Sequence, residues 1–266
     1  MGRSVPIKET LRNLKLVQCL IFILYWLWVN LGFQSSAFFE GSTPGPFSLP
    51  LWMVPAAVSM ACYAVLALSF RKVERWFGTK RAVLLASAVT LLGAVIGSSR
   101  CFPNPFFLPS DASMIVGGVL VGVGTPLLLM SIALIFFWQK PQAVFAESIV
   151  GANVAAVVCF LISSLPQGAL CAFLCLIPPI IGIALISELR RPACRQSHGF
   201  DDRPAFPSKI CATSLVHGMA LGALFGISGD AANGAGTLPF LATAFAAASI
   251  LLFVLALLVG LDYNTL

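Results

Sequence analysis

The stretch Leu16-Val-Gln-Cys-Leu-Ile-Phe-Ile-Leu-Tyr-Trp-Leu-Trp-Val-Asn-Leu31 decides the fold class, because seven more long apolar runs follow it in a chain of 266 residues. Hydrophobic residues make up 59% of the chain and charged residues only 10%. A water-soluble domain of this size cannot bury so much apolar surface, whereas a lipid bilayer dissolves it. The composition therefore predicts an all-α, polytopic helical membrane protein, with the lipid bilayer as the partner that surrounds its helices.

The eight runs are each long enough to cross a bilayer, which takes about 20 residues at 1.5 Å rise per residue. We predict spans over residues 16–33, 49–70, 81–99, 112–138, 143–164, 169–187, 210–228 and 238–261. The sequence therefore predicts eight transmembrane helices.

The placement of the charged residues predicts the orientation of these spans. Basic residues gather in 1–15, 71–81 and 188–209, whereas the alternate connections carry almost none. Connections rich in Lys and Arg stay in the cytoplasm. We therefore expect both termini to be cytoplasmic, in a multi-pass protein of the inner (cytoplasmic) membrane. Topology then explains the net charge of +6 better than contact with nucleic acid does.

One long cytoplasmic connection, 189–209, divides the chain into unequal parts. Residues 1–188 form a first bundle of six helices, and 210–266 begin a second bundle. Six helices, a long inner loop and further helices are typical of a six-plus-six transporter fold. We therefore expect a chain that is part of a longer, major-facilitator-like protein; a genuine eight-helix protein is the alternative.

Ionisable residues inside the membrane are candidates for function because lipid makes charge costly, and here they are scarce. No Asp, Glu, Lys or Arg lies at mid-depth of a predicted span, and Glu147 is interpreted as a carboxylate that stabilises a helix start. The scarcity argues against a proton-coupled pump. His217 and Asn153 remain as ligand-binding or sensing candidates, and the alternative for both is a hydrogen bond that joins neighbouring helices.

Glycines recur at helical spacing on three predicted spans and create smooth faces. Such faces allow helix backbones to approach closely, so we interpret them as packing surfaces rather than ligand sites. Pro126 adds a predicted kink, because proline has no backbone N–H to donate. The predicted packing and hinge residues are Gly93, Gly97, Gly118, Gly122, Pro126, Ser214, Gly218, Gly222 and Gly226.

The residues that carry enzyme or metal chemistry are missing from the sequence. The eight cysteines form no CxxC pair, and no HExxH, Ser–Lys, paired intramembrane Asp or Cys–His arrangement is present. Cys101 lies in a predicted outer connection and Cys194 in an inner one, so these two cannot pair. We expect no catalytic site, no metal site and no cofactor.

The connection after the second predicted span reads Phe70-Arg-Lys-Val-Glu-Arg-Trp-Phe-Gly-Thr-Lys-Arg-Ala-Val-Leu84. It resembles the loop between helices two and three of the major facilitator superfamily, which has an acid and Arg, then Gly and paired bases. Glu74, Arg75, Gly78, Lys80 and Arg81 supply these residue types. When Gly78 is aligned, however, Arg75 occupies the place of the acid.

Three further stretches extend the resemblance over the chain. They are Leu49-Pro-Leu-Trp-Met53, Gly117-Gly-Val-Leu-Val-Gly-Val-Gly-Thr-Pro126 and Leu176-Ile-Pro-Pro-Ile180. Together with the aromatic first span, they look like the membrane domains of LuxR-type regulators, which join a facilitator-like region to a C-terminal helix-turn-helix. The resemblance implies a non-catalytic domain that senses an unknown small molecule. DNA is then a partner only through a C-terminal domain absent from this chain. The alternative function is transport of a small neutral or apolar solute.

Overall fold

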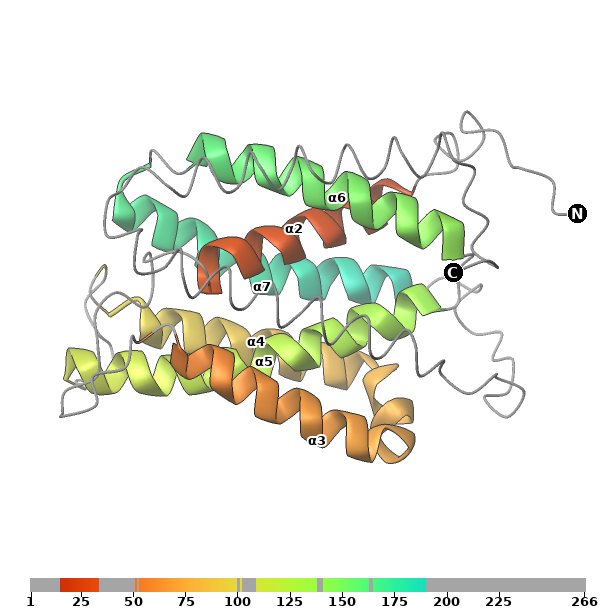
Figure 1. Ribbon diagram of the computed structural model, residues 1–266, viewed down its shortest axis with the longest axis horizontal. Coiled ribbons are helices and arrows are strands. Elements are labelled where there is room, and N and C mark those ends of the chain that lie inside the picture. Colours follow the sequence, from red (N-terminus) through yellow and green to blue (C-terminus); the bar gives the residue numbers. More distant parts are fainter. Residues whose placement is uncertain are drawn as a thin grey trace, which may run out of the picture.

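The computed structural model describes residues 15–33, 51, 53–99, 101, 109–137, 141–162 and 165–189. Within these ranges every regular element is an α-helix and no strand is present. The helices are α2 (Leu16–Phe33), α3 (Met53–Phe77), α4 (Lys80–Gly97), α5 (Ser110–Phe137), α6 (Pro141–Ile162) and α7 (Gln167–Leu189). Consecutive helices run in opposite directions along the long axis of the molecule (Figure 1).

Three of these helices contain stretches long and apolar enough to cross a membrane, namely Lys80–Gly97, Asp111–Leu134 and Gln167–Leu189. Shorter apolar stretches lie at Leu16–Gly32, Met53–Leu66 and Val150–Cys159. These lengths and compositions indicate a membrane protein. The predicted spans 210–228 and 238–261 lie outside the described residues.

The helix boundaries follow the predicted spans closely, except at α3. Five of the helices begin and end within two residues of the predicted limits. The second predicted span, 49–70, differs, because α3 begins at Met53 and continues to Phe77. The prediction of a loop at 71–77 is therefore wrong. The reason is that Arg, Lys, Glu and Trp all tolerate a helix, so nothing stops α3 before Gly78.

The turn between α3 and α4 is short and well defined. It contains only Gly78 and Thr79. The hydroxyl oxygen of Thr79 accepts a hydrogen bond of 3.2 Å from the backbone N–H of Ala82, which makes Thr79 the N-cap of α4. The capped turn fixes where the second of these two antiparallel helices begins.

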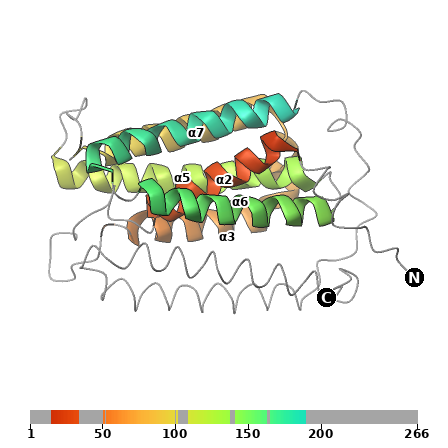
Figure 2. The same ribbon diagram turned by 90° about the horizontal axis from the view of Figure 1, so that it is seen from above.

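The helices form two groups of three. α3, α4 and α5 pack together, as do α2, α6 and α7, and α4 contacts α7 between the groups. Figure 1 shows α2, α6 and α7 above the other group, and Figure 2 gives the view from above. The largest buried side chain at the centre is that of Trp28 on α2.

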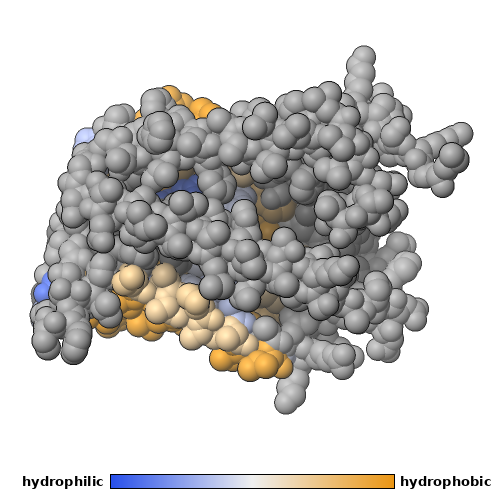
Figure 3. All heavy atoms as spheres, in the orientation of Figure 1, coloured by the Kyte–Doolittle hydropathy of each residue, from blue (hydrophilic) through white to orange (hydrophobic). Residues whose placement is uncertain are grey.

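The outer surface of the described helices is apolar. Leu68 on α3 is 92% exposed and Ile183 on α7 is 70% exposed. Figure 3 shows hydrophobic atoms along the lower edge of the molecule, where Figure 1 places α3. A surface of this kind is costly in water and favourable in lipid, which agrees with the long apolar helices.

Candidate functional site

The hydrogen-bond ladder of α5 is interrupted at Pro126. Proline has no N–H, so the carbonyl oxygen of Gly122, four residues earlier, loses its helical donor. The hydroxyl of Ser59, on α3, donates a hydrogen bond of 3.0 Å to that oxygen. An unpaired carbonyl is expensive in lipid, and side chains of neighbouring helices commonly satisfy it. Ser59 therefore links α3 to the interruption in α5.

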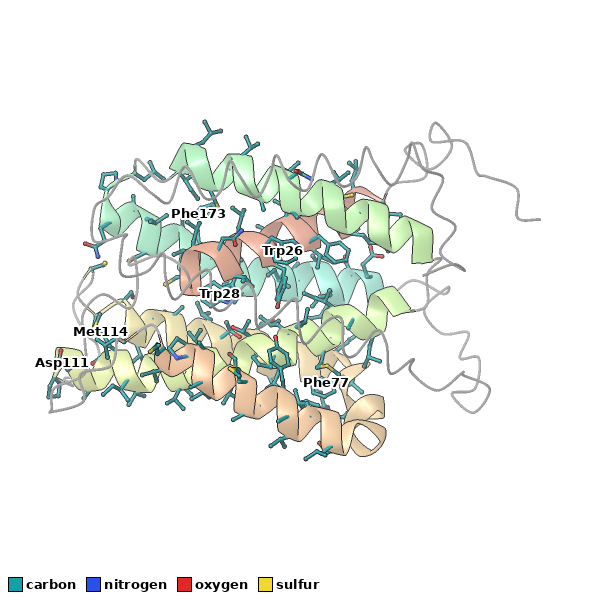
Figure 4. The ribbon with its side chains drawn as sticks, viewed as in Figure 1. Trp26, Trp28, Phe77, Asp111, Met114 and Phe173 are labelled. Atoms are coloured by element: carbon teal, nitrogen blue, oxygen red, sulfur yellow. The ribbon has the colours of Figure 1, made fainter. Side chains whose placement is uncertain are left out.

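A second hydrogen bond reaches the same turn of α5 from α2. The indole Nε1 of Trp28 donates to the hydroxyl oxygen of Thr125 at 3.0 Å, and both side chains are buried. Figure 4 places Trp28 on α2, toward the group of helices that contains α5. Trp28 is therefore both a large packing residue and a polar link between the two helix groups. We call the residues Trp28, Ser59, Gly122, Thr125 and Pro126 the proline junction.

Glycines bring α4 against α5 next to this junction. A Cβ atom added to Gly93 would lie 2.7 Å from the backbone nitrogen of Val121, and one added to Gly117 would lie 2.5 Å from that of Gly97. Real Cβ atoms do not approach backbone so closely, so only glycine fits there. The predicted residues Gly93 and Gly97 thus lie at the contact between the two backbones.

The other predicted glycines of α5 lie against α3. Cβ atoms added to Gly118 and Gly122 would meet Val54, Pro55 and Val58 at 2.7–3.4 Å. α5 is therefore lined with glycine on two sides, toward α3 and toward α4. Gly117 and Gly124 are packing residues that were not predicted from the sequence. Their separation of seven residues places them on one helix face and was an available signal.

A second polar group lies where the first residues of α2 meet α6 and the end of α7. The amide Nε2 of Gln18 donates to Oε2 of Glu188 at 2.9 Å. The backbone N–H of Lys15 donates to Oε1 of Glu147 at 3.1 Å. Gln18 and Glu147 are each 1% exposed and Glu188 is 3% exposed. We call Gln18, Glu147 and Glu188 the carboxylate cluster.

The hydrogen bonds among the described residues do not reach every oxygen atom of the carboxylate cluster. Oε2 of Glu147 and Oε1 of Gln18 are buried and accept no hydrogen bond from the residues that the structure describes. Burying such atoms costs about 1–3 kcal/mol each. Buried polar oxygens of this kind are suited to receive a proton or the donor group of a solute.

The carboxylate cluster extends the sequence interpretation. The sequence predicts no carboxylate at mid-depth of a span, and the structure buries Glu147 and Glu188 near the helix ends. Glu188 lies one residue beyond the predicted sixth span, 169–187, and is the penultimate residue of α7. The helix dipole disfavours an acid in the last turn of a helix. The position of Glu188 was therefore a signal in the sequence that singled this residue out.

The remaining predicted residues are dispersed. Asn153 lies on α6, partly buried, six residues after Glu147, which corresponds to about 9 Å along the helix. Glu74 and Arg75 lie in the last turns of α3, whereas Gly78, Lys80 and Arg81 are exposed at the turn and at the start of α4. The other predicted candidates lie outside the described ranges: His217, Ser214, Gly218, Gly222 and Gly226.

Metal binding finds no support in the described part of the chain. There, no three His, Cys, Asp or Glu side chains are grouped closely enough to hold an ion. Comparisons of the sequence with protein-family models and with curated proteins, and of the chain with solved structures, gave no match.

Proposed function

We propose that this chain is the membrane-embedded, ligand-sensing domain of a LuxR-type transcriptional regulator, with a facilitator-like arrangement of eight spans. It is multi-pass in the cytoplasmic membrane, has both termini in the cytoplasm and performs no catalysis. The ligand is a small molecule, and DNA is bound only by a domain that follows this region. The resemblance of the quoted sequence stretches to the membrane domains of LuxR-type regulators supports the choice of family. The long apolar helices support the membrane location.

The orientation is supported by where the basic residues lie. Lys80 and Arg81 begin α4, and Lys15 precedes α2. In Figure 1 these two helix starts lie at the same, right-hand end of the molecule. Basic residues at one end of an antiparallel bundle are typical of the cytoplasmic side.

The proline junction is the observation that carries the sensing function. Side-chain hydrogen bonds from Ser59 on α3 and from Trp28 on α2 reach the interrupted turn of α5. In a membrane such bonds contribute about 0.6 kcal/mol each on average. These two bonds are therefore weak enough to be exchanged when α5 changes its packing. A ligand that binds one packing better than the other can shift this equilibrium.

In the proposed mechanism, the ligand binds between the two helix groups and changes the contact of α5 with α2. α4 contacts both α5 and α7, so the change reaches α7. α7 ends at Leu189, where the chain enters the basic connection predicted to be cytoplasmic. The signal thus passes to the cytoplasmic side through helix packing rather than through chemistry.

A transporter of a small neutral or apolar solute is the second candidate, and the carboxylate cluster favours it. Buried carboxylates at the end of a helix bundle are used by proton-coupled transporters to bind and release protons. Glu147 and Glu188 are buried in the required way, at the end of the bundle that we assign to the cytoplasm.

DNA binding by the full-length product separates the two functions. The reading frame is followed beyond Leu266, the full-length protein is purified, and a gel shift is measured with the DNA upstream of its own gene. The regulator predicts sequence-selective binding that weakens as salt is raised, because protein–phosphate contacts release counterions. A stop codon directly after Leu266, or no shift at low salt, contradicts the regulator. Proton-driven solute uptake into vesicles then becomes the decisive assay.

A further inference from the structure

Three cysteines gather where α4 ends and α7 begins. Cys101 follows the end of α4 by four residues, and Cys171 is the fifth residue of α7. Their sulfur atoms are 2.8 Å apart although the residues are 70 positions apart in the chain. Cys175 lies one helical turn further along α7. Neither the sensing function nor the transport function uses these thiols.

The position of Cys101 is fixed by the backbone. Its N–H donates a hydrogen bond of 2.8 Å to the carbonyl oxygen of Ser98, and the N–H of Ser98 donates to the carbonyl oxygen of Ala94 at 2.9 Å. These two bonds continue the end of α4 into a tight turn. The turn holds the thiol of Cys101 against α7, so the two sulfur atoms meet without rearrangement of either helix.

We propose that Cys101 and Cys171 form a reversible, redox-controlled disulfide that links α4 to α7. A disulfide has a sulfur–sulfur distance of about 2.05 Å, so the two sulfurs need to move together by less than 1 Å. In Figure 1 the end of α4 and the start of α7 lie at the opposite end of the bundle from the starts of α2 and α4. In the orientation that belongs to the proposed function, this is the outer side of the membrane, where disulfides form and persist.

The oxidant is a disulfide-bearing donor, either a small molecule or a thiol oxidoreductase. The thiolate of Cys101, which is partly exposed, attacks one sulfur of the donor and releases the first donor thiolate. The thiolate of Cys171 then attacks the sulfur of Cys101 in this mixed disulfide, forms the Cys101–Cys171 bond and releases the second donor thiolate. The two cysteines lose two electrons to the donor, and the two protons they gave up are available to the donor thiolates.

The disulfide acts on the contact between the two helix groups. α4 belongs to one group and α7 to the other, and these two helices contact each other along the bundle. A covalent bond at their outer ends prevents the groups from separating there. The oxidised protein is therefore restricted to one of its packings, and reduction restores the exchange between them.

The test counts reactive thiols in the purified chain reconstituted in nanodiscs of phosphatidylethanolamine and phosphatidylglycerol. After treatment with oxidised glutathione, and then denaturation, the alkylatable thiols are counted with a polyethylene-glycol maleimide. The expected count falls from eight to six, since two of the eight cysteines become bonded. Dithiothreitol restores a count of eight. Peptide mapping of the oxidised wild type identifies the bonded pair directly and needs no substituted protein.

Matched substitutions identify which thiols are required. Cys101→Ser and Cys171→Ser each abolish the cross-linked peptide, whereas Cys175→Ser, one turn away on α7, and Cys62→Ser, on α3, leave it intact. Retention of eight reactive thiols in oxidised wild-type protein overturns the proposal. A cross-linked peptide that joins any other pair also overturns it. The readout does not depend on DNA binding or solute uptake, so its outcome is independent of the test of the proposed function.

Discussion

Ser59 donates a hydrogen bond of 3.0 Å to the carbonyl oxygen of Gly122, the atom that Pro126 deprives of its helical donor. The interruption of α5 and its repair therefore come from different helices. Gly122 also has no side chain, which permits α3 to approach to the distance that the hydroxyl of Ser59 requires. Proline, glycine and serine together remove one backbone hydrogen bond from α5 and replace it with a bond from α3.

We expect Ser59→Ala to lower the free energy of unfolding by about 1 kcal/mol, somewhat more than the average membrane hydrogen bond, because the carbonyl of Gly122 is then buried without a donor. The measurement is reversible unfolding in mixed micelles. Ser69→Ala is the matched control on the same helix, since the hydroxyl of Ser69 is partly exposed and donates to the carbonyl oxygen of Val65 on its own helix. If both variants lose the same free energy of unfolding, the hydrogen bond from Ser59 to the carbonyl of Gly122 does not stabilise the protein as assigned.

A double-mutant cycle tests the same relationship more directly. Pro126→Ala restores an N–H that donates to the carbonyl of Gly122. In that background the loss caused by Ser59→Ala is expected to shrink below about 0.5 kcal/mol, because the carbonyl has its helical donor again. If Ser59→Ala costs the same free energy of unfolding with and without Pro126→Ala, then Ser59 does not replace the donor that Pro126 removes.

We expect Trp28→Phe to weaken the link between α2 and α5. Phenylalanine retains most of the ring but has no donor for the hydroxyl oxygen of Thr125, so the expected loss is about 1 kcal/mol. Trp76→Phe, on the more exposed end of α3, is the control and is expected to change stability by less than 0.5 kcal/mol. If the junction controls sensing, only Trp28→Phe also changes ligand-dependent DNA binding by the full-length regulator.

The apolar runs predicted most of the helices. The length and composition that a helix needs to cross lipid are visible in the local sequence and do not depend on which helices it contacts. The end of α3 was misplaced because the residues from Arg71 to Trp76 are polar enough for a loop yet compatible with a helix. Residue spacing located Gly93 on the face that contacts α5. Spacing along one helix does not show which helices meet, so neither the partner of Ser59 nor the proximity of Gln18 to Glu188 was predictable.

We expect Gly117→Ala to be strongly destabilising, by about 1–3 kcal/mol, because the added Cβ would lie 2.5 Å from the backbone of Gly97. The atoms of α4 that the added Cβ would meet belong to the backbone, which cannot move aside as the end of a flexible side chain can. Gly168→Ala is the control, since a Cβ at Gly168 meets nothing within 4 Å and alanine favours the helix. Thermal unfolding of both variants in the same detergent is the measurement, and an unchanged melting temperature for Gly117→Ala contradicts the close approach of α4 and α5.

The carboxylate cluster gives the last prediction, which separates charge from hydrogen bonding at Glu188. Glu188→Gln keeps an oxygen that accepts from Nε2 of Gln18 but removes the negative charge. Glu188→Ala removes both, and it leaves a buried amide donor that costs about 1–3 kcal/mol. We therefore expect Glu188→Ala to lower the unfolding free energy by that amount and Glu188→Gln to preserve stability. If the chain is a transporter, Glu188→Gln abolishes proton-driven uptake while solute exchange across the membrane continues, because a neutral amide does not exchange the proton. Loss of stability in Glu188→Gln equal to that in Glu188→Ala shows that the charge itself, balanced by its surroundings, holds the helix ends together.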